Sequence, residues 1–188
     1  MSELFEAVVA GDVSKAKSLV QGGANVNEAD AEGVTPLMRA AGIGNVEMVN
    51  ALVTAGADVK AVDQKGWTPL FFALYNDEKD CGFPEVVQAL VDAGADVEAQ
   101  IVYGVRPLMI AAGYGEAAVV EVLLNAGADP KARNEGDRTA LMMVKDKDYV
   151  DVINMLHEAE MVVGEEEGCG SRNAPSAQVV TFMKPEKH

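Results

Sequence analysis

The residue types that most often carry out chemistry in proteins are scarce in this sequence. The chain of 188 residues has two histidines, His157 and His188, and two cysteines, Cys81 and Cys169. A zinc site needs such residues at characteristic short spacings, and an activated nucleophile needs a well-placed base. No two of these four residues have the spacing of zinc ligands, and both histidines lie near the end of the chain. We therefore predict neither a metal site nor a catalytic pair.

Two glycine-containing turns and one acidic run match ligand-binding loops only in part. Residues 42–44 (GIG) and 113–115 (GYG) contain two glycines each. A phosphate-binding loop of the dinucleotide type lies between a strand and a helix, whereas these turns lie between two expected helices. The acidic run at residues 77–80 (DEKD) lacks the spacing of a calcium loop. We expect no cofactor and no enzymatic activity.

A repeated sequence pattern predicts the helices and turns that position the other candidate functional residues. A helix-opening tripeptide occurs at residues 35–37 (TPL), 68–70 (TPL), 106–108 (RPL) and 139–141 (TAL). A Gly-Ala pair closes each unit at residues 23–24, 56–57, 94–95 and 127–128. Both series advance by 33, then 38, then 33 residues. A fixed period of this length indicates a solenoid, because no single unit can bury its apolar face alone.

Local chemistry predicts two helices in the most regular unit, residues 31–63. Thr35 is a good N-cap for the first helix, as is Thr68 in the next unit. Small residues at 40 and 41 let a neighbouring unit approach closely. Gly56 suits the left-handed position that ends the second helix. That helix is predicted from apolar residues at helical spacing on one face: Val46, Val49, Leu52 and Val53.

This pattern resembles the ankyrin repeat, which has a 33-residue period and a T-P-L signature. The resemblance implies an all-α fold, a right-handed solenoid of about five stacked helix-turn-helix pairs with β-turn fingers. We assign residues 1–160 to the repeat domain and residues 161–188 to a C-terminal tail. The repeats within the domain are 1–30 (N-terminal cap), 31–63, 64–100, 101–134 and 135–160 (C-terminal cap).

Some positions depart from the family pattern. The 38-residue step gives the third repeat five extra residues (38 against 33), which we place around residues 76–83, between its two helices. Arg106 replaces the capping Thr, at a cost of roughly 1 kcal/mol. The early glycine at residue 136 predicts a positive φ for Asp137. The histidine that follows T-P-L in the family is replaced in every repeat, by Met38, Phe71, Met109 and Met142.

Ankyrin-repeat domains generally bind proteins through a concave face of finger tips and first helices. Matched position by position, the resemblance implies these partner-binding candidates: Val34, Ile43, Lys65, Trp67, Tyr75, Val102, Tyr103, Val105, Tyr114 and Arg138. The set holds four of the five Trp and Tyr residues in the chain, and these are common interface anchors. Trp67 and Tyr75 equally suit a role in covering neighbouring repeats. We predict a non-catalytic interaction module such as an adaptor, inhibitor or effector.

The tail leaves a second function open. Residues 161–188 combine a linker-like composition with a short apolar group at residues 179–183 (VVTFM). The composition favours a disordered tail, but the apolar group also suits folding back onto the fifth repeat or into the groove. The alternative prediction is a self-occupied or assembly-forming structural protein, in which the tail or a second copy fills the concave face.

The net charge of −15 bears on the kind of partner. A negative field repels phosphates and anionic membranes, so we predict neither a nucleic-acid nor a membrane partner. The same field suits a protein partner with a basic segment, and it equally suits plain solubility. The sequence has no apolar run of about 18 residues, no basic signal region and too few cysteines for a disulfide framework. We expect a cytoplasmic protein.

Overall fold

The computed structural model describes residues 2–74 and 82–167 of the chain, and its helices confirm the predicted all-α solenoid. Ten α-helices and one 3₁₀ turn, Val102–Gly104, make up the regular structure of these residues, which contain no β-strand. The α-helices follow one another as five pairs: α1 Glu3–Val9, α2 Val13–Gln21, α3 Pro36–Ile43, α4 Val46–Thr54, α5 Pro69–Leu74, α6 Pro84–Asp92, α7 Pro107–Tyr114, α8 Ala117–Asn125, α9 Ala140–Val144 and α10 Val150–Glu167.

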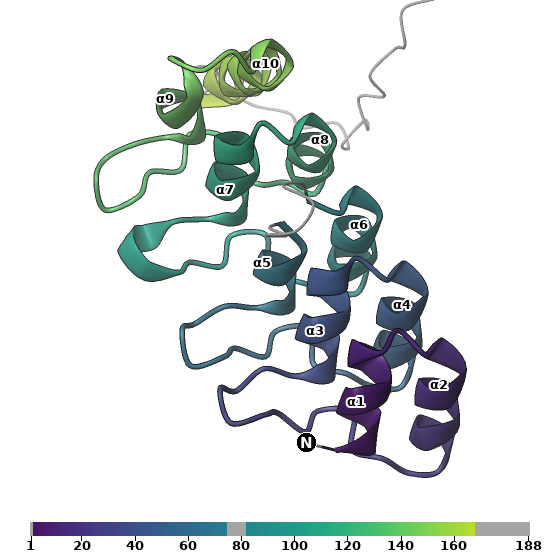
Figure 1. The fold of residues 1–188 in the computed structure, drawn as a ribbon. Coiled ribbons are helices and arrows are strands. Elements are labelled where there is room, and N and C mark those ends of the chain that lie inside the picture. The colour runs from purple at the N-terminus through teal and green to yellow at the C-terminus, as the bar shows by residue number, and fades with distance from the viewer. Residues whose placement is uncertain (1, 75–81, 168–188) are drawn as a thin grey trace, which may run out of the picture.

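The pairs stack in two helical layers (Figure 1). The first helices of the pairs, α1, α3, α5, α7 and α9, pack side by side, and the second helices pack behind them. Four hairpins join successive pairs and project beyond the first-helix layer, at residues 23–34, 56–67, 94–105 and 127–138. We name their tips finger 2 (30–34), finger 3 (63–67), finger 4 (101–105) and finger 5 (134–138). The fingers and the exposed sides of the first helices form what we call the inner face.

Small residues in the first helices bring the pairs together, as predicted. Ala40 and Ala41 of α3 are fully buried, and so are the matching alanines of α7. The prediction for α4 was wrong at one position, because the Val46 side chain is exposed. The buried side of α4 is instead formed by Met48, Val49 and Leu52, which come after Val46 in the helix.

Side-chain caps begin some of the first helices. Thr35 Oγ1 accepts a hydrogen bond from the Met38 N–H at 3.3 Å, and Met38 Sδ accepts one from the Thr35 N–H at 3.3 Å. The cap predicted at Thr68 is absent, because Thr68 Oγ1 is buried without a hydrogen-bond partner. Arg106 makes no capping hydrogen bond at the start of α7, in line with the loss expected there.

Gly56 ends α4 in the predicted left-handed conformation, with a φ of 89°. Its N–H donates to Val53 O at 3.0 Å, and the Ala57 N–H donates to Leu52 O at 3.0 Å. This is a Schellman motif, which satisfies the last carbonyl groups of the helix. The motif fixes where the chain leaves the second-helix layer and enters the hairpin that carries finger 3.

The end of the fifth pair differs from the predicted domain boundary. Helix α10 continues to Glu167, so a boundary at residue 160 falls inside a helix. The rest of the tail lies outside the described residues, including the apolar group at 179–183. Residues 75–81 also lie outside them, and this range covers most of the insertion predicted at residues 76–83. None of the helices that the structure describes is long and apolar enough to cross a membrane.

Candidate functional site

Three of the fingers are closed by a side-chain oxygen at their base. Asp30 Oδ1 accepts hydrogen bonds from the backbone N–H groups two and four residues further on, both at 2.9 Å. Asp63 makes the same two contacts in finger 3, at 2.8 Å, and Asn134 makes them in finger 5, at 2.9 and 3.0 Å. These contacts give the three fingers a defined shape although the usual histidine is missing.

Finger 4 is built differently because Ile101 stands where the other fingers have Asp or Asn. Finger 4 keeps the two backbone bonds that the other fingers also have, from the Ile101 N–H to Val105 O and from the Gly104 N–H to Ile101 O, both at 3.0 Å, but Ile101 offers no side-chain acceptor. Tyr103 adopts a φ of 65°, which is unusual for a bulky residue and was not predicted. Asp137 in finger 5 has a φ of 57°, which confirms the prediction for that residue.

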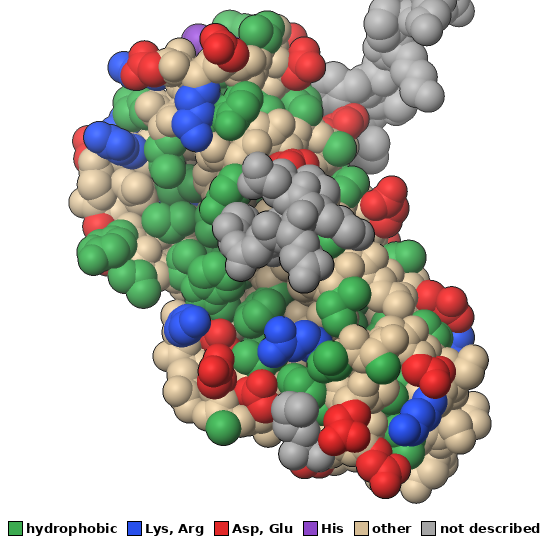
Figure 2. Space-filling view, viewed as in Figure 1, with side chains coloured by type: hydrophobic (Ala, Val, Ile, Leu, Met, Phe, Trp, Pro, Cys, Tyr) green, Lys and Arg blue, Asp and Glu red, His purple; other side chains and the backbone are tan. Residues whose placement is uncertain are grey.

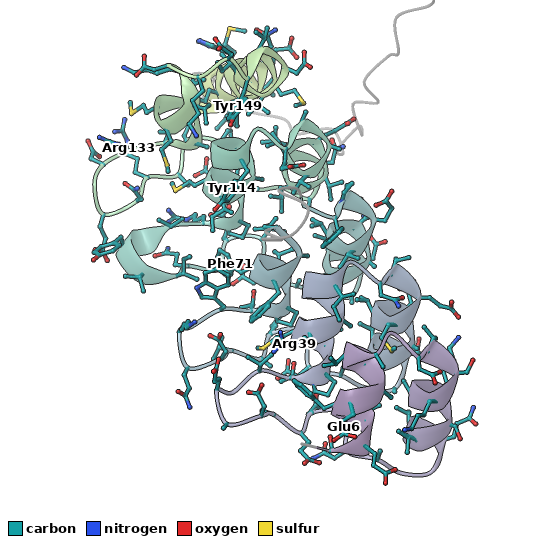
Figure 3. The ribbon with its side chains drawn as sticks, viewed as in Figure 1. Glu6, Arg39, Phe71, Tyr114, Arg133 and Tyr149 are labelled. Atoms are coloured by element: carbon teal, nitrogen blue, oxygen red, sulfur yellow. The ribbon has the colours of Figure 1, made fainter. Side chains whose placement is uncertain are left out.

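Finger 4 also carries the most exposed aromatic side chain among the described residues of the inner face. Tyr103 is 70% exposed and its neighbour Val102 is 61% exposed. Val105 is half-buried against the core. Ile43 and Tyr114, at the ends of α3 and α7, are exposed as well (Figure 3). Figure 2 shows hydrophobic side chains gathered over the middle of the inner face, around finger 4 and the helices beside it.

Trp67 packs against its own repeat while remaining partly exposed. Its ring centroid lies 6.2 Å from that of Phe71 and 5.8 Å from that of Phe72, the second pair in an edge-on arrangement. Phe71 is buried, whereas Trp67 and Phe72 are half-buried. The indole therefore fastens finger 3 to α5 and leaves part of its surface on the inner face.

The remaining predicted residues fall into three groups. Val34 is only 4% exposed and packs in a small cluster with residues of α1 and α3, so it supports finger 2 from within. Lys65 and Arg138 are exposed on fingers 3 and 5. Tyr75 lies outside the described residues. The structure therefore places Val102, Tyr103, Val105 and Trp67 on two adjacent fingers, and it removes Val34 from the available surface.

Sequence reasoning missed a row of residues in the middle of the first helices. The residue four places after each cap position is half-buried, and this row consists of Arg39, Phe72, Ile110 and Met143. The Arg39 guanidinium lies 5.7 Å from the Phe5 ring centroid, and its Nε is buried without a partner. The signal in the sequence was the change at this position from Arg in the second repeat to apolar residues in the next three.

Comparison with known proteins identifies the family. The family model for ankyrin repeats (three copies) matches residues 4–101 and 79–166, which together include nearly all of the described helices. The chain belongs to the ankyrin-repeat family. A stretch of 45 residues is also 49% identical to a mouse (Mus musculus) protein named Ankyrin repeat family A protein 2. That match covers 24% of this chain and only 14% of the mouse protein.

Ankyrin repeats are in general non-catalytic modules of protein–protein interaction, so membership points to a protein partner. In this ankyrin-repeat protein the negative charge is spread along the whole solenoid. Residues 1–100 contain 16 Asp and Glu against 6 Lys and Arg, and residues 101–167 contain 13 against 6. Figure 2 shows acidic side chains around the N-terminal repeats, including those beside fingers 2 and 3. Acidic side chains therefore lie beside the apolar middle of the inner face.

Proposed function

We propose that this ankyrin-repeat protein binds another protein through its inner face, as an adaptor, inhibitor or effector without catalytic activity of its own. The observation that carries the proposal is the exposure of Val102 and Tyr103 side by side on finger 4. Tyr is one of the residues most often found as an interface anchor. Burying one such side chain under a partner contributes roughly 1.5–3 kcal/mol, so two adjacent ones supply a useful part of a binding energy.

The neighbouring residues extend this apolar area across the inner face. Trp67 and Phe72 are half-buried on one side of finger 4, and Ile110 is half-buried on α7. Tyr114 is exposed at the end of the same helix. A partner segment lying across fingers 3 and 4 would cover these side chains together. An apolar centre of this kind, with polar residues around it, is the usual anatomy of a protein interface.

The charge distribution supports a partner that carries basic residues beside its apolar segment. Glu6 of α1 and Glu32 of finger 2 are exposed at the N-terminal end of the inner face. Opposite charges across an interface speed association and fix the orientation of the partner. A net charge of −15 also disfavours nucleic acid as a partner, because phosphates are repelled.

The test compares two substitutions of the same residue type. Val102→Ser removes an exposed apolar side chain from finger 4, and Val162→Ser removes one of equal exposure, 61%, from α10 in the second-helix layer. Proteins captured from cell extract by the intact chain would be identified and purified, and their dissociation constants measured by calorimetry. We expect Val102→Ser to raise the dissociation constant about tenfold, the effect of a modest interface anchor, and Val162→Ser to leave it unchanged.

A second variant addresses Tyr103 without disturbing its backbone. Asn tolerates the positive φ at this position better than most residues, so Tyr103→Asn removes the aromatic ring and preserves the turn. We expect this variant to weaken binding at least as much as Val102→Ser. If every captured protein binds both finger-4 variants as tightly as it binds the intact chain, finger 4 is not the binding site and the proposal fails.

A further inference from the structure

Hydrogen bonds join the first two hairpins at both ends. At the base, Asn27 Nδ2 donates to Gly56 O at 3.3 Å, and Asn27 Oδ1 accepts from the Asp58 N–H at 2.8 Å. At the tip, the Gln64 N–H donates to Glu32 O at 3.0 Å, and Gln64 Nε2 donates to the carbonyl of residue 31 at 2.7 Å. Hairpins 23–34 and 56–67 are therefore fastened to each other.

The last two hairpins are joined in a corresponding way. Glu98 Oε1 accepts from the Asp129 N–H at 2.9 Å at the base, and Tyr103 O accepts from the Glu135 N–H at 2.9 Å at the tip. Arg106, directly after finger 4, adds a third connection. Its Nη1 donates to the carbonyl of residue 133 at 2.7 Å, and its Nε lies 3.0 Å from Glu98 Oε2 in an ion pair that lacks hydrogen-bond geometry.

The junction between the second and third hairpins, which we call the middle step, has no such bonds. Hairpins 56–67 and 94–105 lie wholly within the described residues, and no hydrogen bond joins them. At the base, Lys60 stands where the other steps have Asn27 and Glu98, in the same local turn closed by the side chain two residues earlier. An ammonium group donates hydrogen bonds but cannot accept one, so the connection to the next hairpin is lost.

The packing of the helices shows that the weak connection is confined to the hairpins and the first-helix layer. In the first-helix layer, the described residues of α5 (69–74) pack closely on α3 and only sparsely on α7. In the second-helix layer, α6 packs equally on α4 and on α8. The buried Thr68 Oγ1 without a partner lies at the start of α5, at the same step. At the middle step the second-helix layer is therefore continuous, whereas the first-helix layer is weakly connected.

We propose that the solenoid consists of two blocks, one ending with hairpin 56–67 and α5 and the other beginning with hairpin 94–105, which hinge about the second-helix layer. Trp67 and Phe72 belong to the first block, whereas Tyr103 and Ile110 belong to the second. The hinge therefore changes the width of the apolar area between fingers 3 and 4. The hinge itself rests on the bonding pattern, and only its consequence for partner binding rests on the proposed function.

Spin-label distances test the hinge without any partner. In a chain carrying Cys81→Ser and Cys169→Ser, one labelled pair, Lys65→Cys with Val102→Cys, spans the middle step. The control pair, Glu32→Cys with Lys65→Cys, spans the joined first step. All three labelled positions are exposed on finger tips. We expect a broader distance distribution for the pair across the middle step. Equal widths for the two pairs would overturn the proposal.

A variant that restores the missing hydrogen-bond acceptor controls for differences between the labelled positions. Lys60→Glu places a carboxylate where Glu98 accepts its bond at the next step, and Lys60→Ala removes the lysine without supplying an acceptor. We expect Lys60→Glu to narrow the distribution across the middle step and Lys60→Ala to leave it broad. If Lys60→Glu gives no narrower distribution than Lys60→Ala, the missing connection does not create the hinge. Neither outcome depends on whether finger 4 binds a partner.

Discussion

At the scale of single residues, the base of three of the four fingers is held by one side-chain oxygen that accepts two backbone hydrogen bonds. Asp63 has this role in finger 3, where it holds the backbone of Lys65 and Trp67 at 2.8 Å. Asn134 makes the same contacts in finger 5 with an amide oxygen. A carboxylate charge is therefore not required for these two contacts, since an amide oxygen makes them as well.

We predict that Asp63→Ala lowers the free energy of unfolding by about 1–3 kcal/mol, because two N–H groups lose their acceptor. Asp63→Asn keeps the acceptor and should cost clearly less. Urea unfolding followed by circular dichroism would measure both. Equal losses for the two variants would show that the charge of Asp63 matters more than its hydrogen bonds.

The residues that replace the family histidine do not all behave alike. Met38 accepts the Thr35 N–H through its sulfur, and the Thr35 hydroxyl accepts the Met38 N–H in return. Thr139 keeps its hydroxyl bond to the Met142 N–H at 3.3 Å. In the third repeat the corresponding residue is Phe71, and there the threonine hydroxyl is buried without a partner. The substitutions were visible in the sequence, but their different consequences depend on side-chain packing.

At the scale of elements, an aromatic side chain before a second helix packs on the glycine that ends the first helix of the preceding repeat. Phe83, before α6, lies where a side chain on Gly44 would overlap its ring. Tyr149, before α10, lies in the same relation to Gly115, where an added Cβ would come within 2.8 Å of the ring. This contact locks α3 to the third repeat and α7 to the fifth.

We predict that Gly44→Ala destabilises the protein more than Gly56→Ala. Both glycines have positive φ, 78° and 89°, so each substitution carries a backbone cost of about 1 kcal/mol. Only at Gly44 would the new methyl group also meet an aromatic ring, whereas the space beside Gly56 is open. Thermal melts of the two variants would compare them. A larger loss for Gly56→Ala would contradict the packing of Phe83 on Gly44.

The sequence was informative about elements because their signals are local. The T-P-L tripeptides begin α3 at Pro36 and α5 at Pro69, and the Gly-Ala pairs end the second helices. Connections between hairpins could not be predicted in the same way, since each joins residues about one repeat apart and depends on whether a single side chain can accept a hydrogen bond. Of the candidate site, Val102 and Tyr103 are exposed as a binding role requires, but Val34 is buried.

At the scale of the whole molecule, each helix pair contacts only its neighbours, so damage to one pair spreads along the stack. Ala111 of α7 is fully buried between repeats, and Ala111→Asp puts a charge into that seam at a cost of several kcal/mol. We predict that hydrogen exchange accelerates most in α7 to α10 and least in α1 to α4, because the weakly bonded middle step limits how far the damage travels.

Ala118→Asp is the matched control for this experiment, since residue 118 is exposed on α8, the partner helix of α7. It introduces the same charge in the same repeat without burying it, and its exchange should resemble that of the unmodified chain. Mass spectrometry of peptides from each helix would resolve the pattern. If Ala111→Asp accelerated exchange equally in α1 and in α9, the ten helices would unfold as one cooperative unit. The middle step would then be no weaker than its neighbours, because a solenoid transmits damage evenly only when every interface couples its repeats alike.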